Sequence, residues 1–191
     1  MLLQFKPRIL ILPFAALVIW GLVYYKVNQP QIELSDAERD AIQRRRPAPV
    51  FKLHDQRSQL FRLGTYLGRH KLLIVFFDPS QGASKNAQLQ ILKSGYEQLS
   101  AHGEKVLAIS SATPYANRES FKLGGDFPFF VLSDADYSVE TEWGCMTAGD
   151  PPQVIPSAFV VDRAGVISWS QIGGTPPIPL ETLLRELIKA R

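Results

Sequence analysis

The sequence is poor in sulfur and in metal-binding side chains. Cys145 is the one cysteine among 191 residues, so a disulfide within the chain and a zinc site built from cysteines are both excluded. The three histidines, His54, His70 and His102, are scattered and show no metal-ligand spacing. We therefore predict no metal site, and no residue pattern indicates an organic cofactor.

The sequence also lacks a concentration of charge of one sign. The formal net charge is +3, and part of it belongs to the triplet Arg44–Arg46 rather than to a basic stripe interleaved with aromatics. Nucleic-acid-binding proteins usually carry such a stripe, so we expect no nucleic-acid partner. A chain of this length with 46% hydrophobic residues, without repeats or low-complexity segments, is typical of one globular domain.

One long apolar run, Ile9–Tyr25, stands near the N-terminus and contains no charge. As a helix of about 17 residues, it is near the lower limit for crossing a hydrocarbon core of about 30 Å. Its aromatic end, with Trp20, suits the membrane interface. A cleaved signal peptide is the alternative, but the run is long for one and no small-residue cleavage site follows. We expect residues 1–26 to be a membrane anchor that contacts lipid through residues 9–25.

Basic residues lie on both sides of this run, so the two flanks predict opposite orientations in the membrane. Lys6 and Arg8 favour an N-terminus in the cytoplasm, whereas Arg44–Arg46 favours the opposite. We expect the soluble domain on the non-cytoplasmic side. Residues 27–46 are polar and contain the helix-start pattern Ser35–Glu38, which predicts a short helical or flexible stalk.

From residue 47 to residue 191, short apolar segments alternate with amphipathic ones. We predict strands at 50–54, 59–63, 71–77, 105–110, 129–132, 157–161 and 166–171, and helices at 84–102, 114–123, 137–143 and 180–189. The run that follows Lys71, LLIVFF, is typical of a strand buried on both faces of a sheet. The order predicts one α/β domain with a mixed sheet and helices on both faces.

Several of these segments resemble, in type and order, those of peroxiredoxins (AhpC/TSA) and of the related membrane-tethered TlpA/ResA-like thioredoxins. APVFKLHDQRSQLFRL resembles the opening of these domains, and KLLIVFFDP the strand that delivers their active-site loop. KVLAISSATP and FFVLSDADYSVETEWG are similar to two later passages, and IPSAFVVDRAGVI is the most specific match. The resemblance covers residues 48–191. It implies a thioredoxin-like (redoxin) three-layer α/β/α sandwich with a mixed central sheet, here preceded by one transmembrane helix.

The resemblance also implies an active-site loop after the strand at 71–77. Family members carry a reactive cysteine there, at the N-terminus of the next helix, where the helix dipole lowers the thiol pKa. Gln81 and Ser84 take the cysteine positions of the two-cysteine pattern, and Ala83 or Ser84 takes the peroxidatic position. The equivalent loop comprises Pro79, Gln81, Gly82, Ala83 and Ser84, and no register supplies sulfur.

Two residues outside this loop are also candidates. In the family, the proline corresponding to Pro156 follows a cis peptide bond and faces the loop, whereas a trans proline that begins a strand is the alternative. Cys145 is a candidate catalytic residue because it is the sole thiol. However, it follows a short predicted helix, whose C-terminus disfavours a thiolate, so a buried structural role is the alternative.

Two functions follow from this pattern. The first is a membrane-tethered thioredoxin-fold protein without redox activity that binds or assembles a protein partner at the membrane. The alternative is a membrane-bound peroxiredoxin or thiol oxidoreductase, an antioxidant enzyme that uses Cys145 or an external thiol.

Overall fold

The computed structural model describes residues 46–174 and 177–190. The predicted membrane anchor and nearly all of the predicted stalk lie outside these residues. Within them, the structure contains no helix that is both long enough and apolar enough to cross a membrane.

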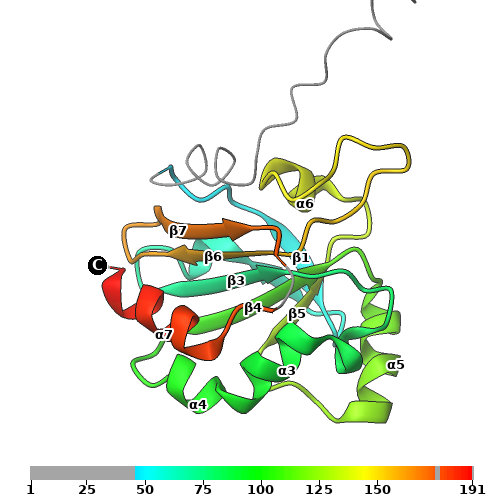
Figure 1. The fold of residues 1–191 in the computed structure, drawn as a ribbon, viewed down its shortest axis with the longest axis horizontal. Coiled ribbons are helices and arrows are strands. Elements are labelled where there is room, and N and C mark those ends of the chain that lie inside the picture. The colour runs from blue at the N-terminus through cyan, green and yellow to red at the C-terminus, as the bar shows by residue number, and fades with distance from the viewer. Residues whose placement is uncertain (1–45, 175–176, 191) are drawn as a thin grey trace, which may run out of the picture. The chain divides into compact units, whose positions relative to one another are not determined.

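The strands form one mixed sheet in the order β2-β1-β5-β4-β3-β6-β7 (Figure 1). Their bounds are β1 (Lys52–Asp55), β2 (Leu60–Arg62), β3 (Leu72–Phe76), β4 (Lys105–Ser110), β5 (Phe130–Ser133), β6 (Ser157–Val161) and β7 (Ile167–Ile172). Strands β3, β4 and β5 run parallel, and the other neighbours pair antiparallel. In the middle of the sheet, Ile74 pairs with Leu107 on one side and with Phe159 on the other. The prediction of a mixed sheet is confirmed.

Alternate side chains of β3 enter two separate apolar cores, one on each face of the sheet. The helical elements are η1 (Leu63–Thr65), η2 (Ala83–Lys85), α3 (Ala87–Ser94), α4 (Tyr96–Leu99), α5 (Pro114–Gly124), α6 (Ser138–Glu142) and α7 (Leu180–Lys189). Leu73 and Val75 pack in the core that α3, α5 and α7 cover. Ile74 and Phe76 pack in the opposite core, which residues of α6 and of the N-terminal segment cover. Alternation along β3 therefore sets the two layers that enclose the sheet.

The single helix predicted over residues 84–102 is divided into η2, α3 and α4. The division between α3 and α4 falls at Gly95, on which the side chain of Leu180 from α7 rests. A Cβ atom at Gly95 would stand 2.4 Å from Leu180 Cδ1. A residue from a distant part of the chain therefore packs directly on the boundary between α3 and α4.

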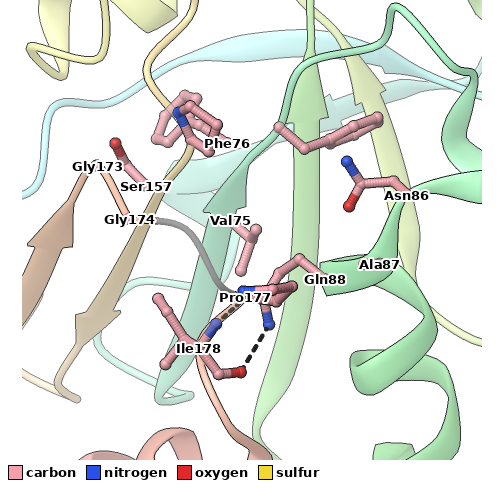
Figure 2. Close-up of a pocket in the computed structure, with 12 residues that line it drawn as sticks. Val75, Phe76, Asn86, Ala87, Gln88, Ser157, Gly173, Gly174, Pro177 and Ile178 are labelled. Atoms are coloured by element: carbon pink, nitrogen blue, oxygen red, sulfur yellow. Dashed lines mark hydrogen bonds between the residues drawn. The ribbon is translucent and has the colours of Figure 1, made fainter.

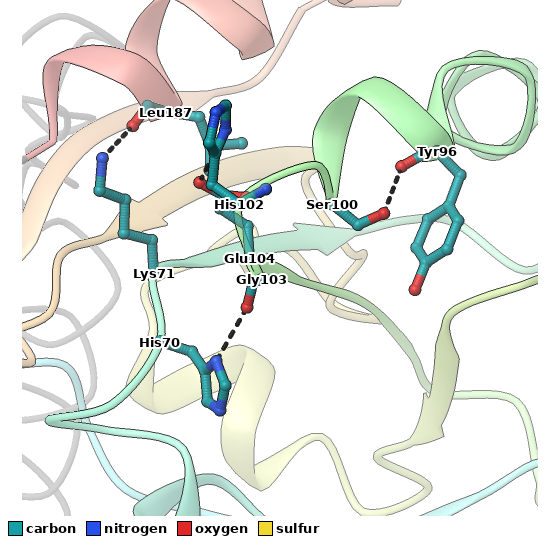
Figure 3. A network of polar contacts seen from close by, with 8 residues as sticks. All are labelled: His70, Lys71, Tyr96, Ser100, His102, Gly103, Glu104 and Leu187. Carbon is teal, nitrogen blue, oxygen red and sulfur yellow. Dashed lines mark hydrogen bonds and ion pairs between the residues drawn. The ribbon is translucent and has the colours of Figure 1, made fainter.

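Polar contacts join the start of β3, the turn before β4 and the end of α7 (Figure 3). Lys71 Nζ donates a hydrogen bond to the carbonyl oxygen of Leu187 at 3.0 Å. The ring atom Nδ1 of His70 lies 2.8 Å from the carbonyl oxygen of Gly103. These contacts lie at the opposite end of β3 from the loop at residues 78–85, so His70 has a structural role.

Candidate functional site

The loop that follows β3 is folded on its own hydrogen bonds. The backbone N–H and the hydroxyl of Ser80 both donate to the carboxylate of Asp78, each at 2.9 Å. The N–H of Gly82 donates to the carbonyl oxygen of Pro79 at 2.8 Å. Gly82 has φ of 77°, a backbone conformation that glycine adopts without strain. The loop is therefore held in one shape without help from a ligand.

The next residues, Ala83 and Ser84, lie in η2 and pack against α5. Ala83 is buried, and the N–H of Ser84 donates to Ser120 Oγ at 2.8 Å. A Cβ atom at Gly124 would stand 2.7 Å from Ser84 Cβ, so η2 and the end of α5 are in direct contact. Gln81 is exposed. These three candidates from the sequence therefore do not lie at the N-terminus of α3.

The residue at that helix N-terminus is Asn86. Its side-chain oxygen accepts a hydrogen bond from the N–H of Leu89 at 3.2 Å, which is the usual N-cap contact. The structure therefore places Asn86, rather than Ala83 or Ser84, where the family resemblance puts a reactive thiol. Asparagine before a run of helix-forming residues is an N-cap signal that could have identified this position from the sequence.

A cavity of about 160 Å³ opens beside Asn86, between the end of β3, the start of α3 and the start of β6 (Figure 2). Most of its wall is apolar. The residues that line it are Val75, Phe76, Phe77, Asn86, Ala87, Gln88, Pro156, Ser157, Gly173, Gly174, Pro177 and Ile178. The cavity thus brings Asn86 and the predicted site residue Pro156 together, whereas the residues of the 79–84 loop do not line it.

The peptide bond before Pro156 is not cis, so that prediction is wrong. Among the described residues, the cis peptide bond lies at Asp150–Pro151. The N–H of Ile155 donates to the carbonyl oxygen of Cys145 at 2.7 Å, and the carbonyl oxygen of Pro156 accepts from the N–H of Gly173 at 2.9 Å. Backbone partners on both sides therefore hold this segment with the trans bond that most X–Pro peptides adopt.

Cys145 is fully buried, with 0% of its surface exposed. Its Sγ atom lies 3.7 Å from the carbonyl oxygen of Trp143, in the core on the α6 face of the sheet. Burial raises the pKa of the Cys145 thiol well above its ordinary value; the hydroxyl of Ser157 lowers it in part and the nearby Glu140 raises it further. In this structure the sulfur is a neutral thiol at neutral pH and has no access to solvent.

No set of three histidine, cysteine, aspartate or glutamate side chains in the described part of the chain is arranged to hold a metal ion. His102 lies in the turn that precedes β4. Its backbone N–H donates a hydrogen bond to the carboxylate of Glu104 at 2.8 Å.

Residues 45–170 match the model of the AhpC/TSA family. The chain belongs to this family. It is 28% identical over 124 residues to peroxiredoxin Q, chloroplastic, of Oryza sativa subsp. japonica, a match that covers 64% of this chain and 55% of that protein. It is 29% identical over 133 residues to alkyl hydroperoxide reductase E of Mycobacterium tuberculosis, covering 65% of this chain and 82% of the relative. The chain therefore spans about half the length of the plant relatives that it matches.

Solved structures support the predicted fold class. The crystal structure of a peroxidoxin from Mycobacterium tuberculosis superimposes with a TM-score of 0.66 at 18% identity, covering 78% of this chain and 98% of the other. The reduced 2-Cys peroxiredoxin of Plasmodium vivax gives a TM-score of 0.68 at 15% identity, covering 77% and 95%. At these identities the likeness shows the fold alone. The thioredoxin-like fold with a mixed sheet is confirmed.

Proposed function

We propose that this member of the AhpC/TSA family binds a protein partner at the cavity beside Asn86 and does not reduce peroxides with a thiol of its own. The observation that carries the proposal is the identity of the residue at the N-terminus of α3. A cysteine there would be stabilised as a thiolate by the helix dipole and by unpaired N–H groups. The carboxamide of Asn86 has no ionisable group and no nucleophilic atom of this kind.

The environment of Cys145 supports the same proposal. Peroxide reduction by a cysteine requires a thiolate that the peroxide reaches. Cys145 has none of its surface exposed, and its pKa is raised by burial. Neither condition is met in the described structure.

The size and lining of the cavity favour a peptide side chain as its occupant. Pockets for drug-sized ligands usually measure about 300–1,000 Å³, whereas this cavity measures about 160 Å³. Its walls include Val75 and Ile178, and Asn86 adds an amide at one side. An apolar side chain, with a backbone polar group near Asn86, matches this combination.

A photo-crosslinking residue placed at Ala87 tests the binding site. Ala87 is exposed and lines the cavity, and Glu97, exposed on α4, is the matched control position. We expect a discrete crosslinked adduct from position 87 in native membranes and no such adduct from position 97. Adducts of equal yield from both positions, or none from position 87, would contradict the assignment of this surface.

We further propose that residues 9–25 hold the domain at a membrane on the non-cytoplasmic side. The support is the uncharged run Ile9–Tyr25 and the basic residues Lys6 and Arg8 that precede it. In sealed vesicles whose cytoplasmic face is outward, a tag at the C-terminus should resist protease until detergent is added. Digestion of the tag without detergent would show that the domain lies on the cytoplasmic side. Release of the intact chain by alkaline carbonate would show that residues 9–25 do not anchor it in the membrane.

Membership of the AhpC/TSA family favours a second candidate, an antioxidant enzyme. At family level, relatives described as peroxiredoxin or alkyl hydroperoxide reductase support this candidate better than they support a binding role. In this case a Cys145 thiolate would attack one peroxide oxygen and become a sulfenic acid, releasing water or an alcohol. Two external thiols would then reduce the sulfenic acid to the thiol, leaving as a disulfide and releasing its oxygen as water. Peroxide consumption that a thiol donor sustains, and that Cys145→Ser abolishes, would establish this function.

A further inference from the structure

The carboxyl group of Glu140 is buried on the α6 face of the sheet, where neither of the functions above uses it. Glu140 has 0% of its surface exposed. Neither of its carboxyl oxygens has a hydrogen-bond partner with normal geometry among the described residues, and the nearby backbone N–H of Ser111 lowers its pKa only in part. A buried charge without partners is costly, so this side chain must stay neutral as long as it stays inside.

The backbone of Glu140 is held by hydrogen bonds on both sides, and its side chain has no exposed surface. Its N–H donates to Asp134 Oδ2 at 2.7 Å, a contact that holds the first turn of α6. Its carbonyl oxygen accepts from the N–H of Cys145 at 2.8 Å. Water reaches the fully buried carboxyl group only if the structure around it opens, and the hydrogen bond between the backbones of Glu140 and Cys145 couples a movement of α6 to Cys145.

The charged groups that face Glu140 do not compensate a negative charge. Asp134, at the end of β5, is buried, and its charge opposes ionisation of Glu140. Arg46, from the N-terminal segment, is directed elsewhere: its Nη2 atom lies 3.5 Å from the carbonyl oxygen of Glu142, and its charge acts on Cys145. The described residues form no ion pair with Glu140. Burial, and secondly Asp134, raise the pKa of Glu140 from an ordinary 4.5 to about 8.

We propose that α6 is a pH-dependent cover over Cys145, and that ionisation of Glu140 opens it and exposes the one thiol of the chain. In the open form Glu140 is hydrated and loses its proton readily, whereas in the closed form it holds the proton. Rising pH therefore favours the open form, by up to about tenfold per pH unit. The window runs from the ordinary pKa of 4.5 to the raised pKa of about 8, and the effect levels off above it. This inference does not depend on the proposed function.

Thiol labelling of the full chain in a non-ionic detergent measures the opening directly, because Cys145 is the sole cysteine. The rate of reaction with a maleimide is divided by the rate for the unfolded chain at the same pH, which removes the titration of the thiol itself. Between pH 5.5 and pH 7.5 the resulting opening constant should rise about 70-fold in the native chain. In Glu140→Gln the opening constant should keep only the smaller pH dependence that Asp134 contributes.

Glu142→Gln is the matched control, since Glu142 lies exposed on the same helix. It should keep the pH dependence of the native chain. The same pH dependence in Glu140→Gln as in the native chain would overturn the proposal, as would an opening constant of the native chain that does not change with pH.

Amide hydrogen exchange keeps the proposal testable if Glu140→Gln fails to fold. In the native chain, exchange at residues 138–145, corrected for its intrinsic pH dependence, should accelerate over the same window while β3 and β4 stay protected. Uniform acceleration of all segments would mean global unfolding rather than the opening of α6, and would contradict the proposal. Loss of partner binding at Asn86 would leave this result unchanged, so the two proposals can fail separately.

Discussion

The side-chain amide of Gln88 pairs with both backbone polar groups of Ile178, 90 residues further along the chain. Gln88 Oε1 accepts from the N–H of Ile178 at 2.7 Å, and Gln88 Nε2 donates to its carbonyl oxygen at 3.2 Å (Figure 2). The pair joins the first turn of α3 to the segment before α7, and both residues line the cavity beside Asn86. The shape of the proposed binding site therefore depends on one amide.

Replacing Gln88 by alanine should loosen this wall of the cavity. Two hydrogen bonds are lost and the backbone of Ile178 is left without these partners, so the free energy of unfolding should fall by about 1–2 kcal/mol. Urea denaturation measures the loss, and amide exchange at Ile178 should accelerate. Gln98→Ala, at an exposed glutamine of α4, is the control. An equal loss of unfolding free energy in both variants would argue against a stabilising role of the two hydrogen bonds between Gln88 and Ile178.

Gly95→Ala should destabilise the protein through Leu180. The added Cβ atom would stand 2.4 Å from Leu180 Cδ1, so the Leu180 side chain would have to move out of its position on α3 and α4, at a cost of about 1–3 kcal/mol. Thermal unfolding measures the change. In a double-mutant cycle, Leu180→Ala should remove most of the added cost; additive effects would mean that the clash is not its source.

A cysteine placed at position 86 should be more acidic than one at the other end of α3. Asn86 is the N-cap of this helix and Ser94 is its last residue, so the helix dipole lowers the thiol pKa at the first site and raises it at the second. Both variants are made with Cys145→Ser, and the pH dependence of alkylation gives each pKa. Asn86→Cys should titrate below the usual value of about 8.5. Equal values would show that this position does not favour a thiolate.

The stability of the native chain should fall relative to Glu140→Gln as the pH rises. The folded state holds the Glu140 proton up to about pH 8 and the unfolded state loses it near 4.5, so the unfolded state binds fewer protons between these values. The difference in unfolding free energy should therefore grow by up to about 1.4 kcal/mol per pH unit in this window. Melting curves from pH 5 to pH 8 measure it, and parallel curves for the two proteins would contradict the raised pKa.

Much of the fold can be predicted from the sequence because its apolar runs are continuous and the residues that end its strands and helices lie close to them in the sequence. The run after Lys71 becomes β3, buried throughout, and the strands predicted at 157–161 and 166–171 become the antiparallel pair β6 and β7. The packing of Leu180 on Gly95 cannot be predicted in this way, because it joins residues from distant parts of the chain.

The candidate site is less predictable from the sequence, because contacts between distant parts of the chain shape it. Motif counting points to Ala83 or Ser84, but η2 inserts a turn before α3, and Asn86 then occupies the helix N-terminus. The resemblance predicts a cis bond before Pro156, whereas the cis bond among the described residues lies at Asp150–Pro151. The contacts of the Glu140 backbone with Asp134, which follows β5, and with Cys145, which follows α6, are likewise not revealed by any local pattern.

Peroxide consumption by the purified full chain with an excess of a thiol donor tests the central claim most directly. Native chain, Cys145→Ser and Asn86→Cys are compared at the same pH, with the donor alone as background. We predict that the native chain and Cys145→Ser both consume peroxide at the background rate, and that Asn86→Cys exceeds it because a thiolate then stands at the N-terminus of α3. Consumption by the native chain well above background, lost in Cys145→Ser, would contradict the account and establish the antioxidant enzyme instead.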